Sequence, residues 1–262
     1  MIQLLTESSG IRAISRITKL HQETVLKILR LAGKISHKFM DGKIKGLKCE
    51  VVQADEIHSI VYAKDWGLKE KHDGRGSQYT FISVDAKSRL IINSYTGLRN
   101  EDSTMKFLST LKKRVNGRFQ INTDAWSGYT SRGRNPNCIR RAFGEDIDHA
   151  TEEKEFYKLN QFVTRKLSKT NRKSRIGNPD LNRASTSYIE RINLSMRLFN
   201  RRFTRCTLGF SKKLMNHRYA INLFMWNHNF ARKHDTIKTT PAIACGISFV
   251  TMTIEELWKY NG

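Results

Sequence analysis

Three carboxylate residues occupy widely separated positions in otherwise apolar stretches of the chain. Asp55 lies in the strand-like run VVQADEIHSIVYA, Asp124 ends the apolar run of RFQINTDAWSGY, and Glu190 lies in the helix-like segment STSYIERINLSMRLFNRR. Burying an unpaired carboxylate is costly, and a counter-charge or a metal ion is the usual remedy. Carboxylate oxygens that converge bind hard divalent cations. The sequence therefore predicts metal-assisted chemistry, provided that folding brings the three residues together.

The charge balance indicates a polyanionic partner. The 262 residues include 47 Lys and Arg against 24 Asp and Glu, which gives a formal net charge of +23. Such an excess attracts nucleic acid through phosphate neutralisation and counterion release. Phosphodiester chemistry on nucleic acid fits this charge together with the acidic residues, whereas the charge alone leaves a ribosome-associated or simply basic protein open.

The cysteines and the apolar runs bear on the cellular compartment. The four cysteines are scattered without a C-x-x-C pair, which argues against a zinc ribbon or a disulfide framework and fits a reducing cytosol. They are Cys49, Cys138, Cys206 and Cys245. No apolar run is long enough to span a bilayer, and the first residues lack the layout of a signal peptide. We expect a cytoplasmic protein.

The first forty residues carry helical periodicity on both sides of a short break. Apolar residues recur at Ile11, Ile14 and Ile17, and again from Val25 onward. This pattern predicts a helix-turn-helix at residues 1–40, whose second helix enters the DNA major groove, with two core helices as the alternative. Lys19 lies in the turn, where a left-handed backbone costs a non-glycine residue roughly 1 kcal/mol. The candidate DNA contacts are Gln22, Glu23, Thr24, Lys27 and Arg30.

A mixed sheet is predicted for the middle of the chain. A Lys/Gly-rich connector, GKISHKFMDGKIKGLK, contains the start of a linker that we place at residues 41–50. After it come a strand with Asp55, a hairpin turning at residues 85–88, a helix capped near Asn100 and a short strand FQINTD. This order predicts an α/β (α+β) fold, a mixed sheet flanked by helices, for residues 51–205.

Two further segments are predicted from composition and periodicity. The polar, basic stretch KLSKTNRKSRIGNPDLNRAS indicates a long loop or insertion around residues 165–185, either a solvated linker or a loop that follows phosphates. Residues 206–262 are predicted to form a helical extension, whose aromatic face is interpreted as core rather than as a stacking platform. Cations on the Glu190 helix and after it are further candidate DNA contacts: Arg191, Arg197, Arg201, Arg202, Arg205, Lys212 and Lys213.

Other polar residues compete with the three carboxylates for a place in the site. Glu56 follows Asp55 and would point to the opposite face of a strand, so a structural role is favoured over a supporting one. Asp85 fits a turn. His149 is interpreted as a structural histidine rather than as a group that orients phosphate or water.

Over nearly its whole length, the chain resembles bacterial transposases of the "insertion sequence one" family. The likeness is tightest in QADEIHSIVYAK, in NTDAWSGY and in STSYIERINLSMRLFNRRFTRCTLGFSKKLMNH with the tail NFARKHDTIKTTPAIACGI. The block from Ser185 to His217 is the most specific. His58 stands where the family motif has tryptophan, and we expect a curtailed amino-terminal DNA-binding region.

The resemblance implies a fold, a site and partners. The fold would be of the RNase H-like, retroviral-integrase type, with Asp55, Asp124 and Glu190 as a catalytic triad that binds two Mg2+, or Mn2+ in their place. The reaction would hydrolyse DNA at the element's ends and join the 3'-hydroxyls to target DNA. The implied partners are the terminal inverted repeats, target DNA and at least one further copy of the chain, in the bacterial cytoplasm beside the nucleoid. Two alternatives remain: a DNA-binding regulator with an inert catalytic domain, and an RNase H-like nuclease or resolvase.

Overall fold

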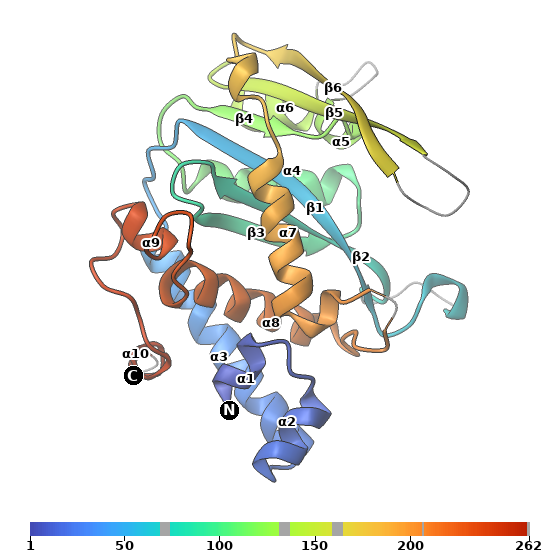
Figure 1. The fold of residues 1–262 in the computed structure, drawn as a ribbon, viewed down its shortest axis with the longest axis vertical. Helices are drawn as coiled ribbons and strands as arrows, with labels where there is room; N and C mark the ends of the chain where they lie inside the picture. The colour runs from blue at the N-terminus through green and yellow to red at the C-terminus, as the bar shows by residue number, and fades with distance from the viewer. Residues whose placement is uncertain (69–73, 131–136, 159–164, 206, 261–262) are drawn as a thin grey trace.

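A six-stranded mixed sheet flanked by helices forms the centre of the protein (Figure 1). The computed structural model describes residues 1–68, 74–130, 137–158, 165–205 and 207–260. The strands are β1 (Val51–Val61), β2 (Gly76–Asp85), β3 (Ile91–Gly97), β4 (Gln120–Thr123), β5 (Asp148–Lys158) and β6 (Arg165–Ile176). The α-helices are α1 (Ile2–Thr6), α2 (Ile11–Thr18), α3 (Gln22–Lys43), α4 (Glu101–Lys112), α5 (Ser127–Thr130), α6 (Cys138–Phe143), α7 (Ser187–Phe199), α8 (Leu214–Trp226), α9 (Pro241–Ala244) and α10 (Ile254–Lys259). Short turns are η1 (Asp65–Gly67), η2 (Leu181–Arg183), η3 (Arg201–Phe203) and the π-helical η4 (Asn227–Ala231).

The predicted mixed sheet is confirmed, and β1 lies inside it. The strand order is β3-β2-β1-β4-β5-β6, in which β1 pairs antiparallel with β2 and parallel with β4. The predicted hairpin between β2 and β3 is also confirmed, since Asp85 Oδ2 accepts a hydrogen bond from Ser88 N at 2.8 Å in its turn. Asn100 caps α4 by accepting from Ser103 N at 3.0 Å. Strand periodicity and capping chemistry were therefore sufficient to predict these elements.

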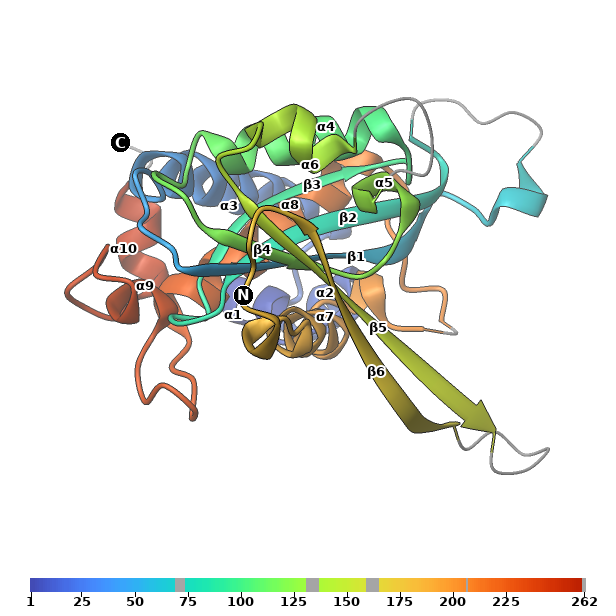
Figure 2. The same ribbon diagram turned by 90° about the horizontal axis from the view of Figure 1, so that it is seen from above.

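Helices cover both faces of the sheet (Figure 2). α4 and α6 lie on one face, whereas α7 lies across the other. α7 begins where the buried side chain of Gln53 on β1 accepts hydrogen bonds from Tyr188 N at 2.8 Å and Ile189 N at 3.0 Å. Next to it on β4, Asn122 donates to the carbonyls of Arg183 and Ser185, just before the helix. Buried amide side chains therefore fix the start of α7 against the two central strands.

The stretch from residue 33 was predicted as a connector, and this is wrong as far as Lys43, because α3 continues through it. A β-carbon on Gly33 would lie 2.4 Å from the carbonyl oxygen of Tyr219 on α8, so the glycine permits close approach of two helices. Phe39, farther along α3, packs edge-on against Phe230 and Tyr260. Gly33, which opens the predicted connector, therefore serves helix packing instead of ending a helix.

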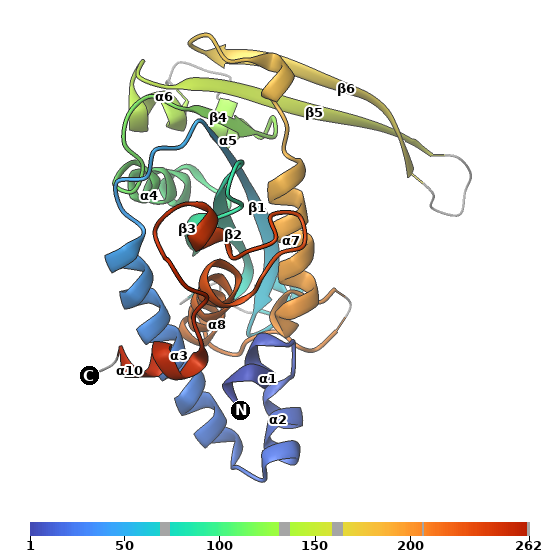
Figure 3. The ribbon, with the colours of Figure 1, turned by 60° about the vertical axis from the view of Figure 1, so that its left-hand side comes forward.

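The basic segment around residues 165–185 was predicted as a loop, and this is wrong for residues 165–176. They form β6, which pairs antiparallel with β5 in a long hairpin that projects from the body (Figure 3). Arg172 lies 3.3 Å from Glu152, and both Lys173 and Arg175 lie within 3.4 Å of Glu153. Cross-strand ion pairs, rather than contacts of an apolar face, stabilise the pairing of β5 with β6. A search for hydrophobic alternation therefore could not detect β6.

The amino-terminal helices pack as a pair. Ile14 of α2 and Val25 of α3 are fully buried, whereas Ile17, predicted on the same apolar stripe, is 63% exposed. Lys19 adopts the left-handed backbone with φ of 60°, and Ser15 Oγ donates to Leu20 O across the turn. Whether this pair of helices binds DNA stays a prediction.

The remaining observations concern the cysteines and the surface. Cys49, Cys138 and Cys245 are free thiols, and Cys206 lies outside the described residues. The long helix predicted near the carboxyl end is α8 with η4, and its Trp226 and Phe230 are fully buried, which confirms a core role. None of the helices in the described part of the chain combines the length and the apolar composition that a membrane crossing requires.

We expect Gln53→Met to lower the free energy of unfolding by about 1–3 kcal/mol, because two backbone N–H groups of α7 lose their acceptor in a buried place. Urea denaturation measures the change. Gln78→Met is the matched control: Gln78 is equally buried, and its Nε2 has no partner among the described residues. A loss in the control as large as that of Gln53→Met would contradict the assigned role.

Candidate metal centre

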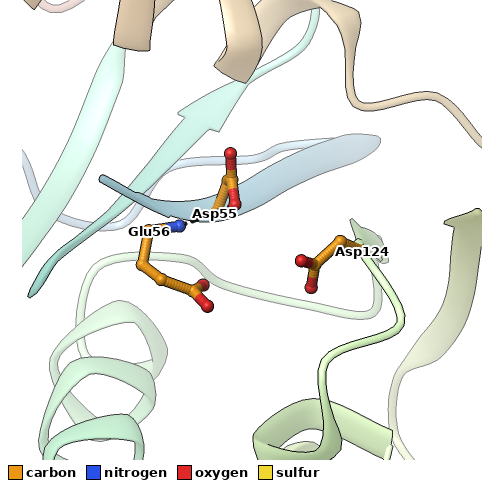
Figure 4. A group of neighbouring side chains, drawn as sticks. All are labelled: Asp55, Glu56 and Asp124. Atoms are coloured by element: carbon orange, nitrogen blue, oxygen red, sulfur yellow. Dashed lines mark hydrogen bonds between the residues drawn. The ribbon is translucent and has the colours of Figure 1, made fainter. Parts of the chain in front are cut away.

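Two of the three predicted carboxylates are brought together by parallel pairing of β1 with β4. Gln53 on β1 is in register with Asn122 on β4, and Asp55 and Asp124 each lie two residues farther along. One oxygen each from Asp55, Glu56 and Asp124 can be chosen so that all three lie within 4.8 Å of one another (Figure 4). Asp124 directly follows its strand, where Oδ1 accepts from Trp126 N at 3.0 Å. The sheet therefore places two carboxylates from distant segments at one point.

Glu56 is the third member of this acidic cluster. Its side chain and that of Asp55 leave β1 on opposite sides, as strand alternation predicts (Figure 4). The Glu56 side chain is only 1% exposed. Its Oε2 accepts from the hydroxyl of Tyr129 at 3.2 Å, and its Oε1 accepts from Arg99 Nε at 2.6 Å. Glu56 therefore has a structural role, because it binds Tyr129 and Arg99, and it also adds a carboxylate beside Asp124.

Arg99 supplies the cluster with a counter-charge. Its guanidinium lies 2.6 Å from Glu56 Oε1 and 3.8 Å from Asp124 Oδ2. The guanidinium carbon lies 4.7 Å from the centre of the Trp126 ring and 5.6 Å from that of Tyr79, so aromatic faces hold it in place. The protein thus offsets part of the acidic charge with its own cation.

Glu190 stands apart from the acidic cluster. Its Oε1 accepts from Lys154 Nζ at 2.5 Å and from Thr186 Oγ1 at 2.7 Å. One turn later on α7, Asn193 Nδ2 donates to Asp55 Oδ2 at 2.8 Å, so the helix face that carries Glu190 lies over Asp55. The charge of Glu190 contributes to raising the pKa of Asp55. The helix therefore brings Glu190 near the site, while Lys154 binds its carboxylate.

Burial and mutual repulsion raise the pKa values of the acidic cluster. Burial, followed by the charge of Asp124, raises the pKa of Asp55 to about 7 and that of Glu56 to about 8. Burial also raises the pKa of Asp124, against hydrogen bonding from Trp126 and the charge of Arg99. Carboxylates that resist ionisation this strongly gain most from a nearby cation. Hard oxygen donors of this kind suit Mg2+ or Mn2+.

The predicted DNA contacts differ in exposure. Gln22, Thr24 and Lys27 on α3 are exposed, whereas Arg30 pairs with Glu23 at 2.9 Å and donates to Asn216. Arg202 points inward: its Nε donates to Ser211 Oγ at 2.8 Å, and burial lowers the pKa of its guanidinium to about 10. Arg197 is half-buried, and the exposed cations are Arg191, Arg201, Arg205, Lys212 and Lys213.

Several residues of the site were not found by sequence reasoning. Arg99, Lys154 and Asn193 reach the carboxylates from three different elements, and no motif distinguishes them from other polar residues. The spacing of Asn193 three residues after Glu190 was the one available signal, because such residues share a helix face. His149 is fully buried against Thr123 at 3.0 Å, which agrees with its structural interpretation.

The stability of the metal-free protein should fall as pH rises from about 5 to about 8. Unfolded Asp and Glu titrate near pH 4, whereas folding raises the pKa of Asp55 to about 7 and that of Glu56 to about 8. Between these values the folded protein holds more protons than the unfolded chain, so the free energy of unfolding decreases with pH. The slope should reach up to about 1.4 kcal/mol per pH unit for each carboxyl.

Urea denaturation across this pH range, in the presence of a chelator, checks the expectation. Glu56→Gln removes one of the two groups and should flatten the slope. Glu145→Gln changes a carboxylate that is 73% exposed and should leave the slope intact. An identical slope in wild type and Glu56→Gln would contradict the assignment.

In comparisons with known proteins, the sequence matches no protein-family model and no curated protein.

Proposed function

We propose that this protein is a metal-dependent DNA transposase that cuts and joins the ends of an insertion sequence. One observation carries the proposal: parallel pairing of β1 with β4 puts Asp55 beside Asp124, and Asn193, one turn after Glu190 on α7, donates to Asp55. Asp55, Asp124 and Glu190 are the three residues that the resemblance to "insertion sequence one" transposases implies. The formal net charge of +23 supports DNA as the substrate.

The fold supports an RNase H-like catalytic domain and a helix-turn-helix. β1 is an inner strand with an antiparallel neighbour, β2, on one side and a parallel neighbour, β4, on the other. α2 and α3 form a tight helical pair, and the exposed residues at the start of α3 are candidates to enter the major groove. These candidates include Gln22, Thr24 and Lys27.

The carboxylates are suited to hold two Mg2+ ions. The ligands we propose are Asp55, Asp124 and Glu190. To bind an ion, the Glu190 carboxylate would give up its ion pair with Lys154. When bound, the ions would activate the attacking oxygen and stabilise the leaving oxygen of phosphoryl transfer. Glu56 offers another oxygen beside Asp124, and Arg99 is placed to offset the charge of whichever carboxylates remain unligated.

The proposed partners are duplex DNA and further copies of the chain. Terminal inverted repeats and target DNA both have to reach the site, and joining two element ends requires at least a dimer. We place the protein in the bacterial cytoplasm, beside the nucleoid. Cations exposed on and after α7 would contact the phosphates: Arg191, Arg201, Arg205, Lys212 and Lys213.

Two other functions use parts of the same structure. An RNase H-like nuclease or resolvase would share the acidic site without joining strands, so a 3'-end joining assay separates it from a transposase. A DNA-binding regulator with an inert catalytic domain would keep its carboxylates neutralised by Arg99 and Lys154, as their ion pairs allow. Sequence-specific binding without Mg2+-dependent nicking would favour the regulator.

Substituting any one of the three carboxylates should abolish most of the activity. We expect Asp55→Asn, Asp124→Asn and Glu190→Gln each to lower Mg2+-dependent cleavage at least about 100-fold, since one shared metal site loses a ligand. The substrate is a labelled duplex that carries the inverted repeats flanking the reading frame. Glu145→Gln is the surface control. Full cleavage by all three variants would overturn the proposal.

Lys154 should compete with metal for Glu190. Because the ammonium lies 2.5 Å from Glu190 Oε1, its removal in Lys154→Gln should raise the affinity for Mn2+ several-fold. Calorimetric titration without DNA measures this affinity. Lys113→Gln, at an exposed position after α4, controls for the loss of one positive charge. Equal affinities for wild type and Lys154→Gln would show that this ion pair does not restrain the site.

A further inference from the structure

Aromatic and cationic side chains gather at the carboxyl end of β1, away from the acidic cluster. Trp66 on η1 is 86% exposed, and Leu208 is 89% exposed. η1, drawn in cyan, extends from this end of the sheet (Figure 2). We name this region the Tyr62 surface. Its centre is Tyr62 with Arg75, Phe210 and Lys212, and it includes the exposed Trp66 and Leu208, which lie four residues after Tyr62 and three residues before Ser211 in the chain.

The chain that follows α7 is fastened to the end of β1. Tyr62 N donates to Ser211 O at 2.8 Å, and Lys212 Nζ donates to Tyr62 O at 3.1 Å. The guanidinium carbon of Arg75 lies 4.5 Å from the centre of the Tyr62 ring, and Lys212 Nζ lies 4.6 Å from that of Phe210. Two separate segments thus place cations directly beside aromatic rings.

The backbone at Tyr62 is strained. Its φ of 71° lies in the left-handed region, which a bulky residue seldom adopts. Hydrogen bonds to Ser211 and Lys212 hold it there, and the residue remains 43% exposed. Asp65, an acidic residue of the region, accepts from Ser77 N at 2.7 Å through Oδ1. The structure therefore keeps an aromatic ring at the surface in a conformation that core packing alone does not require.

Strand β1 connects the acidic cluster with the Tyr62 surface, because it carries Asp55 and ends at Val61, next to Tyr62. Val61 is six residues beyond Asp55 on β1, which corresponds to roughly 20 Å. At the rise of about 3.4 Å per base pair of duplex DNA, this distance corresponds to roughly six base pairs, and an unpaired strand, which is more extended, crosses it with fewer nucleotides.

We propose that the Tyr62 surface binds unpaired nucleotides of the DNA strand whose phosphate occupies the acidic site. Aromatic rings stack on the faces of unpaired bases, and adjacent cations neutralise the phosphates between them. Base pairing and stacking hide those faces in a duplex, so intact duplex gains only from the cations. The inference rests on the proposed function and adds a substrate feature to it, a frayed or single-stranded end.

The test compares two fluorescein-labelled DNAs in the presence of EDTA, so that binding does not depend on metal or cleavage. One is a blunt duplex, and the other carries a single-stranded tail of about eight nucleotides. Trp66→Ala should weaken binding of the tailed DNA roughly tenfold, with less than a twofold effect on the blunt duplex. Trp66→Phe should restore most of the affinity. Trp258→Ala, which changes another partly exposed tryptophan on α10, is the matched control.

Two outcomes would overturn the inference: unchanged binding of tailed DNA by Trp66→Ala, or an equal loss on both DNAs, which would indicate a general phosphate contact. Cleavage is assayed separately with the carboxylate variants. Loss of tail preference in Trp66→Ala without any Mg2+-dependent cleavage by wild type would support this surface and reject the transposase. Cleavage that depends on Asp55, together with wild-type tail binding by Trp66→Ala, would reject this surface alone.

Discussion

The position of α7 depends on one buried amide. Gln53 is 2% exposed, and its side-chain oxygen accepts hydrogen bonds from two backbone N–H groups at the start of the helix. Those N–H groups have no partner within the helix, so a polar residue on the sheet serves as their acceptor. Two residues along the same strand, Asp55 accepts from Asn193 on the same helix. β1 therefore holds both the helix that carries Glu190 and the central carboxylate of the site.

The same strand creates an electrostatic conflict that the protein resolves locally. Acidic groups whose pKa values rise to about 7 and 8 stand in a chain with a large excess of positive charge. Arg99 pairs with Glu56 and Asp124, and Lys154 pairs with Glu190 and Glu152. These cations stabilise the acidic site by offsetting part of its charge.

The β5–β6 hairpin is linked to the site through charge. Glu152 on β5 accepts from Thr186 N just before α7, and it also pairs with Arg172 on β6. Lys154, on the same strand, binds Glu190. The composition of this basic segment suggested a loop that binds phosphates. Several of its cations instead form ion pairs within the protein. Its ion pairs order the hairpin without DNA and extend to the third carboxylate.

The sequence by itself determined the elements that carry the carboxylates. Strand alternation around Asp55 and the apolar stripe after Glu190 are local patterns, and local patterns define secondary structure. Tertiary structure alone decided that Glu56 joins the cluster, that Lys154 binds Glu190 and that residues 165–176 form a strand. Each of these depends on which segments pair in the folded chain, and side-chain pairing sets this where hydrophobic periodicity does not record it.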